Sequence, residues 1–491
     1  MRKSGILLPV SSIPSKYGIG TFSKQAYAFI DLLEKAGQTY WQMLPLGPTG
    51  YGDSPYQSFS TFAGNPYYID LEKLIEEGYL TKEECEQYDF GDNAEYVDYE
   101  KVYNSRFKVL RKAFKNSKIE EKEEFKTFIS QNSYWLDDYA LYMAVKNSFD
   151  GISWIEWDED IKLRKESALA SYREKFAEEI AFYQFQQFLF AKQWTALKDY
   201  ANKKKIQIIG DIPIYVAFDS ADTWANPELF QLDDTCTPIA VAGCPPDAFS
   251  ATGQLWGNPL YRWDYHKKTE YAWWMKRIAY CYELYDVVRI DHFRGFDEYY
   301  AIPYGDPTAE FGHWEQGPGY DIFKTMKEKL GKKAVIAEDL GFLTDSVLKL
   351  VKKTGYPGMK ILQFAFDSRE ESDYLPHNYT TNSVVYTGTH DNDTMLGWYQ
   401  SLNRHDKAFA KKYLNIRSNK DVQWEFIRAA MSSVSDTCIV PMQDYLGLGT
   451  EARINVPSTL GTNWKWRMLP DAFDEELAER IRKMTKLYGR L

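Results

Sequence analysis

Three short apolar runs in the second half of the chain each end in acidic residues. The runs are VVRIDHF, AVIAEDL and VVYTGTHD, and they carry Asp291, Glu338 and Asp391. Each run is rich in valine or isoleucine and too short for a helix, so we expect three buried parallel strands. In a barrel enzyme the C-terminal ends of the strands converge on one cleft. Because three carboxylates in one cleft would repel one another, they imply either a metal ion or chemistry that uses paired acids.

Cleavage of a glycosidic bond is chemistry of the second kind. One carboxylic acid protonates the leaving oxygen, and a carboxylate meets the cationic carbon that develops. Asp291 is the better candidate for the carboxylate. Arg289 lies two residues earlier on the same face of the strand and would keep Asp291 ionised. Glu338 follows an apolar run with no basic residue close in sequence, so its pKa can be raised as a general acid requires. His390 and Asp391 add an imidazole and a third charge suited to sugar hydroxyls.

Two other functions use similar residues. A Mg²⁺-dependent lyase on a barrel would employ Asp211, Asp291, Glu338 and Asp391 as oxygen ligands. Such enzymes usually add a lysine or histidine base, but no lysine stands at these strand ends, and Arg289 beside the acids disfavours a cation. A sugar-binding barrel without catalysis is the other alternative, but binding alone gives no reason to cluster three acids. A single aspartate at a strand end could also merely cap a helix, which three together make improbable.

The elements that would position these acids alternate between strand and helix. Helical periodicity is clear in 24–37, 180–197 and 344–355, and in a closing helix that carries Leu477, Ile481, Met484 and Leu487. This alternation predicts one (β/α)8 (TIM) barrel over 1–491. We expect insertions at its C-terminal rim at about 72–203 (helical), 216–285 (a long aromatic loop) and 299–330. The expected strands are 5–10, 40–46, 206–214, 286–293, 333–340, 358–366, 382–389 and 437–445.

Composition limits the partners. The net charge is −11 and there is no long basic run, so we expect no nucleic-acid or membrane partner. Aromatic residues make up 16% of the chain, and those in Gly/Pro/Ser-rich segments suit the flat apolar faces of sugar rings. The five cysteines form no CxxC pair, and the N-terminal segment reads as a strand, not as a signal peptide. We therefore expect a cytoplasmic protein.

Several blocks of the sequence resemble a known family. RIDHFRGF, IAEDLG and GTHDNDT, preceded by GDIPIYV (210–216), are similar to blocks of the 4-α-glucanotransferases, also called amylomaltases or disproportionating enzymes (glycoside hydrolase family 77). The similarity continues in 8–20, 52–71, 245–261 and 446–467, so it spans nearly the whole chain. It implies a retaining transferase that moves part of a (1→4)-α-D-glucan to the 4-OH of another glucan or of glucose, without a cofactor. An α-glucan hydrolase is the alternative within this class, and the oligomeric state is left open.

The resemblance also implies a role for individual residues. Asp291 would be the nucleophile, Glu338 the general acid and base, and Asp391 the residue that stabilises the transition state. Tyr56 would stack on the donor ring, while Phe249 and Trp256 would line the acceptor side. The remaining substrate-binding residues would be Asp211, Arg289, His390 and Asn463.

Overall fold

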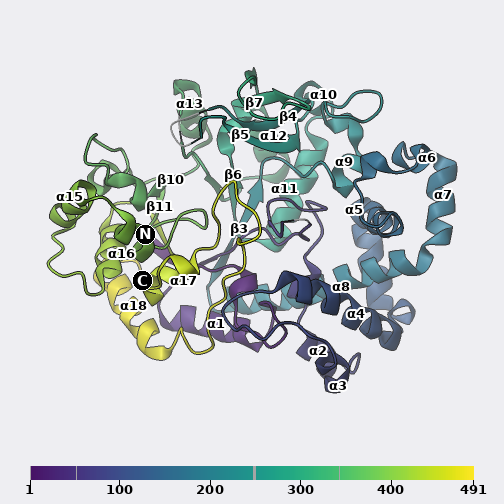
Figure 1. Cartoon of the computed structure of the whole chain (residues 1–491), viewed down its shortest axis with the longest axis horizontal. Helices are drawn as coiled ribbons and strands as arrows, with labels where there is room; N and C mark the ends of the chain where they lie inside the picture. The colour runs from purple at the N-terminus through teal and green to yellow at the C-terminus, as the bar shows by residue number, and fades with distance from the viewer. Residues whose placement is uncertain (1, 51, 247–249, 342) are drawn as a thin grey trace.

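A parallel eight-stranded sheet forms the centre of the computed structural model, which describes residues 2–50, 52–246, 250–341 and 343–491 (Figure 1). Each predicted strand is confirmed, although all eight are shorter than expected. The strands follow one another in chain order around the sheet, and β12 pairs with β1. They are β1 (Lys3–Leu7), β2 (Tyr40–Gln42), β3 (Gln207–Pro213), β6 (Val287–Asp291), β9 (Val335–Ala337), β10 (Gly358–Ile361), β11 (Ser383–Tyr386) and β12 (Thr437–Pro441).

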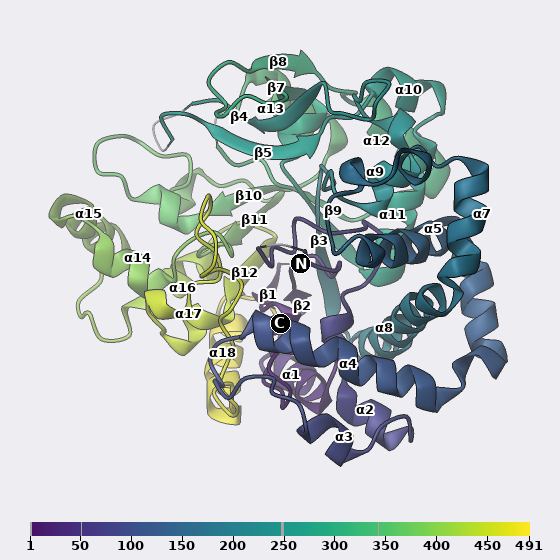
Figure 2. The same ribbon diagram turned by 45° about the vertical axis from the view of Figure 1, so that its right-hand side comes forward.

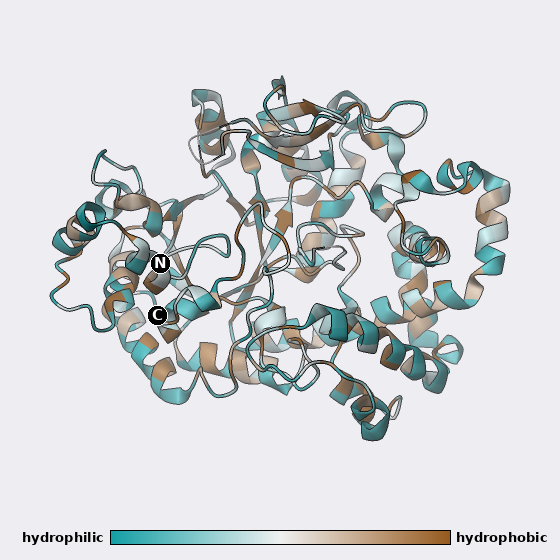
Figure 3. Ribbon diagram, in the orientation of Figure 1, coloured by the Kyte–Doolittle hydropathy of each residue, from teal (hydrophilic) through white to brown (hydrophobic). Residues whose placement is uncertain are grey.

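The sheet curls into a barrel whose last seam lies between β9 and β10. There the Ala337 N–H donates to the Pro357 carbonyl at 3.0 Å. One buried apolar cluster contains residues from most of the strands, among them Leu7, Ile209, Ile336, Val384 and Ile439. In Figure 3 the central strands carry apolar residues, and the surrounding helices carry apolar and polar residues in alternation. The (β/α)8 barrel predicted from the sequence is therefore confirmed.

Helices with one apolar face surround the barrel. In α1 (Lys24–Lys35) the residues Phe29, Ile30 and Leu33 are buried. The helix α13 (Asp345–Thr354) lies within the predicted span 344–355 and stops where Gly355 adopts a left-handed conformation, with φ of 73°. The others in the second half are α11 (Ala272–Leu284), α12 (Asp321–Leu330), α14 (Met395–Ser401), α15 (Arg404–Leu414), α16 (Val422–Ser432) and α17 (Met442–Leu446).

The closing helix α18 (Glu475–Leu487) packs against α1 and α16. Ile481 is buried as expected, but Leu487 is 71% exposed, so the predicted apolar stripe is wrong at its last position. The reason is that the helix ends at Leu487, so this side chain has no following turn of helix beside it. Arg490, which follows the helix, is buried and donates to the carbonyls of Met431 and Lys3, which holds the two ends of the chain together.

A large helical excursion separates β2 from β3. It occupies the right-hand side of Figure 1 and includes the long helix α8 (Ala177–Lys203), whose residues Phe185, Leu189 and Leu197 are buried. Its helices are α2 (Leu71–Glu76), α3 (Lys82–Glu86), α4 (Tyr99–Ser117), α5 (Glu123–Ser148), α6 (Glu159–Lys162), α7 (Glu166–Lys175) and α8 (Ala177–Lys203). No helix in the described ranges is long and apolar enough to cross a membrane.

A small antiparallel sheet lies beside the barrel, at the upper edge of the molecule in Figures 1 and 2. Its strands run in the order β5-β4-β7-β8. The sequence predicts a long loop for much of this region, but β4 and β5 form a hairpin there, so the interpretation as loop is wrong for those residues. The strands are β4 (Ala240–Cys244), β5 (Gln254–Pro259), β7 (Glu298–Pro303) and β8 (His313–Gln316), with the short helices α9 (Ala221–Ala225) and α10 (Trp263–Lys268) nearby.

Candidate active site

Arg289 joins two aspartates, Asp211 within β3 and Asp291 at the end of β6. The register of the two strands sets Asp211 opposite Arg289, and Asp291 follows two residues later on the same face. Arg289 donates through Nη1 to Asp211 Oδ2 at 2.6 Å and through Nη2 to Asp291 Oδ1 at 2.8 Å. The Arg289 and Asp211 side chains are 4% and 0% exposed, whereas Asp291 is 31% exposed. The predicted pairing of Arg289 with Asp291 is thus confirmed, and Asp291 is the partner that remains accessible.

Glu338 follows β9 and faces the end of β6. Its Oε2 accepts the His292 N–H at 2.8 Å, and its Oε1 accepts the Leu340 N–H at 2.8 Å. Burial, together with the nearby charge of Asp291, raises the pKa of Glu338 to about 7, although Arg289 and the two backbone donors oppose the increase. The raised pKa predicted from the apolar run is confirmed. A carboxyl group with this pKa can both give and take a proton near neutral pH.

His292 shapes the end of β6. Its backbone is left-handed, with φ of 55°, so the strand stops there and the His292 N–H points to Glu338. A non-glycine residue in this conformation is uncommon, and histidine tolerates it better than a branched residue would. Burial lowers the pKa of His292 to about 4, so its imidazole is neutral at neutral pH.

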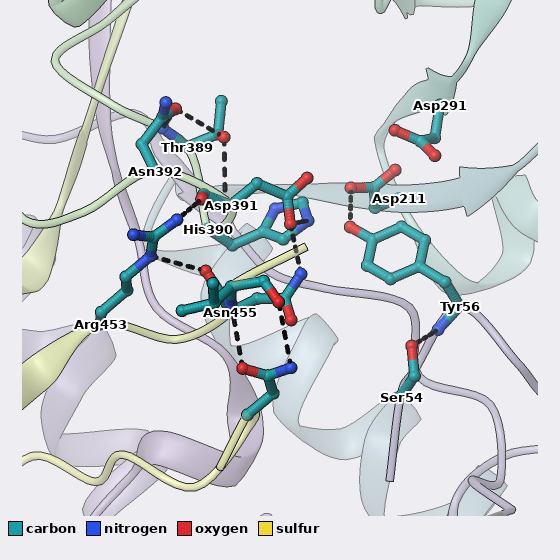
Figure 4. Close-up of polar contacts among 12 residues, drawn as sticks. Ser54, Tyr56, Asp211, Asp291, Thr389, His390, Asp391, Asn392, Arg453 and Asn455 are labelled. Atoms are coloured by element: carbon teal, nitrogen blue, oxygen red, sulfur yellow. Dashed lines mark hydrogen bonds and ion pairs between the residues drawn. The ribbon is translucent and has the colours of Figure 1, made fainter. Parts of the chain in front are cut away.

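Asp391 approaches from the loop after β11. Its carboxylate lies 3.3 Å from His390 Nε2 and accepts a hydrogen bond from Asn455 Nδ2 at 2.6 Å. Arg453 donates to the Asp391 backbone carbonyl at 2.6 Å. Figure 4 shows Asp391 between this polar support and the side that holds Asp211 and Asp291. Sequence reasoning missed Asn455 and Arg453. Their segment belongs to a block that resembles the known family, but nothing in the sequence says which loop they contact.

Tyr56 contacts both Asp211 and His390. Its hydroxyl donates to Asp211 Oδ2 at 2.8 Å, and its ring stacks on His390 with 5.1 Å between ring centroids and an interplanar angle of 16°. Burial raises the pKa of Tyr56 well above its ordinary value, so the hydroxyl remains a donor. Figure 4 shows the ring beneath Asp211, pointing into the space between Asp291 and Asp391.

The other predicted binding residues differ in where they lie. Trp256 is in β5, and its ring meets His292 edge-on at 4.8 Å, so it stands beside the nucleophile candidate. Asn463 is buried and uses its side chain within its own loop, where it accepts from the Val456 N–H at 3.0 Å and donates to the Thr459 carbonyl at 2.8 Å. Phe249 lies outside the described residues.

Two of the carboxyl groups in the assembled site, Asp291 and Glu338, have different environments. Asp291 is held by a buried guanidinium, while Glu338 is held by backbone N–H groups in a buried position that favours its neutral form. This division of environment separates a carboxylate from an acid, as bond cleavage between sugars requires. Within the described ranges, no group of three or more Asp, Glu, His or Cys side chains is arranged to hold a metal ion.

Comparison with known proteins gives matches over the whole chain. A family model described as 4-alpha-glucanotransferase matches residues 8–472. A 4-alpha-glucanotransferase of Clostridium butyricum is 53% identical over 483 residues, which is 98% of this chain and 99% of that protein. One from Thermus thermophilus is 47% identical and covers 100% of this chain and 99% of its own length. Among solved structures, an amylomaltase from Streptococcus agalactiae in complex with acarbose superposes with a TM-score of 0.97 at 44% identity, covering 100% of both chains.

Proposed function

The chain belongs to the 4-alpha-glucanotransferase family, and on this premise we propose how its side chains transfer a segment of an α-1,4-glucan. Asp291 is the nucleophile, Glu338 is the general acid and base, and Asp391 stabilises the transition state. The observation that carries this assignment is geometric. Arg289 holds one oxygen of Asp291 at 2.8 Å, and the buried Glu338 accepts the N–H of the next residue, His292, at 2.8 Å. Burial and the charge of Asp291 raise the pKa of Glu338 to about 7, which agrees with its role as the acid.

In the first half of the reaction the glycosidic bond of the donor breaks. Protonated Glu338 gives its proton to the leaving oxygen, which departs as the 4-OH of the released fragment. The Asp291 oxygen that Arg289 does not hold attacks the anomeric carbon and forms a covalent glycosyl-enzyme. Positive charge develops on the sugar ring at this point, and we assign its stabilisation to the Asp391 carboxylate, which Asn455 fixes.

In the second half the acceptor replaces the enzyme. Glu338, now a carboxylate, takes the proton from the 4-OH of a glucan or of glucose, and that oxygen attacks the anomeric carbon while the bond to Asp291 breaks. Two inversions give net retention of configuration. No step in this sequence calls for a cofactor.

Other residues hold the two substrates. Tyr56 and His390 form a stacked pair that suits the apolar face of the donor sugar. Asp211 accepts the tyrosine hydroxyl, and Arg289 holds the nucleophile. Trp256, next to His292, suits the acceptor side, and Asn463 shapes the loop that carries Asn455. We propose α-1,4-glucans as donors and glucose or maltooligosaccharides as acceptors, and a cytoplasmic location in view of the cysteine usage.

The substitution Asp291→Asn tests the assignment of the nucleophile. The amide cannot form a stable glycosyl ester, so kcat should fall by at least about 10³-fold, whereas a maltooligosaccharide should still bind, as measured by calorimetry. Asp286→Asn is the matched control. This residue stands just before the same strand and accepts the Ile208 N–H at 2.8 Å, which an amide oxygen can also do. An Asp291→Asn enzyme that keeps a tenth of the activity would overturn the assignment.

A further inference from the structure

A large cavity lies at the end of the barrel opposite the carboxylates. It measures about 440 Å³ and extends between the C-terminal ends of α12 and α13 to the first residues of β6, β9 and β12. This volume falls within the range of small-molecule binding sites, roughly 300–1,000 Å³. The transfer reaction described above makes no use of this end of the barrel.

The charge lining this cavity is of one sign. Lys327, Lys332, Lys333 and Lys353 line it, and none of the described lining residues is Asp or Glu. This is unusual for a chain whose net charge is −11. None of the four lysines forms an ion pair with another described residue. By contrast, Lys329, also on α12 but outside the lining, is paired with Glu270 at 2.6 Å.

Aromatic rings and apolar side chains complete the lining. Tyr320, Phe323 and Tyr356 stand beside the lysines, and the Lys353 ammonium lies 4.4 Å from the centre of the Tyr320 ring. Ile336 and Val384, which belong to the apolar cluster inside the barrel, line its deeper part. The cavity thus offers positive charge together with flat and apolar surfaces for a ring.

The type of cation narrows the class of anion. All four are lysines, whose compact ammonium groups bind phosphate as point charges, whereas recognition of a planar carboxylate favours the fork of an arginine. A phosphate monoester carries between one and two negative charges at neutral pH and three acceptor oxygens, which several lysines can share. We propose that this cavity binds a small organic phosphate, in which a phosphate monoester is carried on a ring such as that of a nucleotide or a sugar.

The test measures binding directly, so its outcome is independent of the proposed catalytic roles. Isothermal titration calorimetry would use the full chain with AMP and with ribose 5-phosphate as probes, and with adenosine as the uncharged counterpart. We expect at least one of the two phosphates to bind one site per chain with Kd of about 1 mM or below, and the tighter one identifies a nucleotide or a sugar phosphate. Adenosine should bind at least about 10-fold more weakly than the tighter of the two phosphates. Added salt should weaken the binding of the phosphate.

Two variants locate the site. Lys332→Gln/Lys333→Gln/Lys353→Gln should weaken phosphate binding by about 10-fold or more, since it removes three of the four charges. Lys324→Gln/Lys329→Gln removes two lysines of α12 that do not line the cavity and should bind like the parent chain. Maltotriose turnover and thermal unfolding verify that each variant is folded. Saturation by neither phosphate up to about 10 mM, equal binding by the triple variant, or adenosine binding as tightly as the tighter phosphate would each overturn the proposal.

Discussion

At the residue scale, Glu338 combines a buried carboxyl group with a negatively charged neighbour. Both raise its pKa, to about 7, so protonated and ionised forms coexist near neutral pH. The free enzyme must hold this proton to cleave the donor. Raising the pH through about 7 removes it, and we predict that kcat/KM for maltotriose falls on the alkaline side by about tenfold per pH unit.

A donor that needs no proton isolates this effect. With an α-maltotriosyl fluoride the leaving fluoride departs without protonation, so the alkaline decline in kcat/KM should vanish or shrink strongly. A pH profile from pH 5 to about 9 for both donors makes the comparison. An identical alkaline decline for both donors would assign the titrating group to another role.

At the scale of elements, Asp339 secures the seam between β9 and β10. Its carboxylate accepts the Met359 N–H at 2.7 Å, and a Cβ added at Gly358 would come within 2.1 Å of it, so the two strands meet closely at this side chain. Asp339→Ala leaves a buried backbone donor without its partner. We predict a loss of about 1–3 kcal/mol in the free energy of unfolding, read as a lower Tm.

The conservative replacement tests whether the hydrogen bond or the negative charge of Asp339 provides the stability. Asp339→Asn keeps an oxygen that can accept from Met359, so most of the stability should return. If Asp339→Ala unfolds at the same temperature as the parent chain, the seam is held by other contacts, such as the bond from Ala337 to Pro357.

The eight strands were predictable because each is a short apolar run, and three of these runs carry an acid to the same edge of the sheet. The hairpin of β4 and β5 could not be predicted in this way. The residues of Ala240–Cys244 have small side chains without a clear alternation of apolar and polar positions, and the segment that follows is rich in Pro and Gly. The hydrogen bond from Asn455 to Asp391 could not be predicted from the sequence either. The two residues are 64 positions apart, and only the closed barrel brings them together. The pairing of Arg289 with Asp291 was visible because it depends only on alternation within one strand.

At the scale of the whole molecule, the balance between transfer and hydrolysis depends on how the covering segments shield the glycosyl-enzyme from water. Trp256 of the small sheet reaches over the end of β6, where its ring contacts His292. With maltotriose we predict glucose and a ladder of longer maltooligosaccharides, with almost no gain in reducing ends. Trp256→Ala should raise the hydrolysed fraction by about threefold or more, because the acceptor is held less well. An unchanged product ratio would show that the shield lies elsewhere.

The most direct test of the central claim is to trap the glycosyl group on its carboxylate. In a Glu338→Gln enzyme the α-maltotriosyl fluoride should still glycosylate Asp291, but the acceptor can no longer be deprotonated, so the covalent adduct accumulates. Peptide mass spectrometry should find one maltotriosyl group on Asp291, and none in the enzyme that also carries Asp291→Asn. A sugar found on Asp391 or on another carboxylate, or fluoride release without any adduct, would contradict the assignment of Asp291 as the nucleophile.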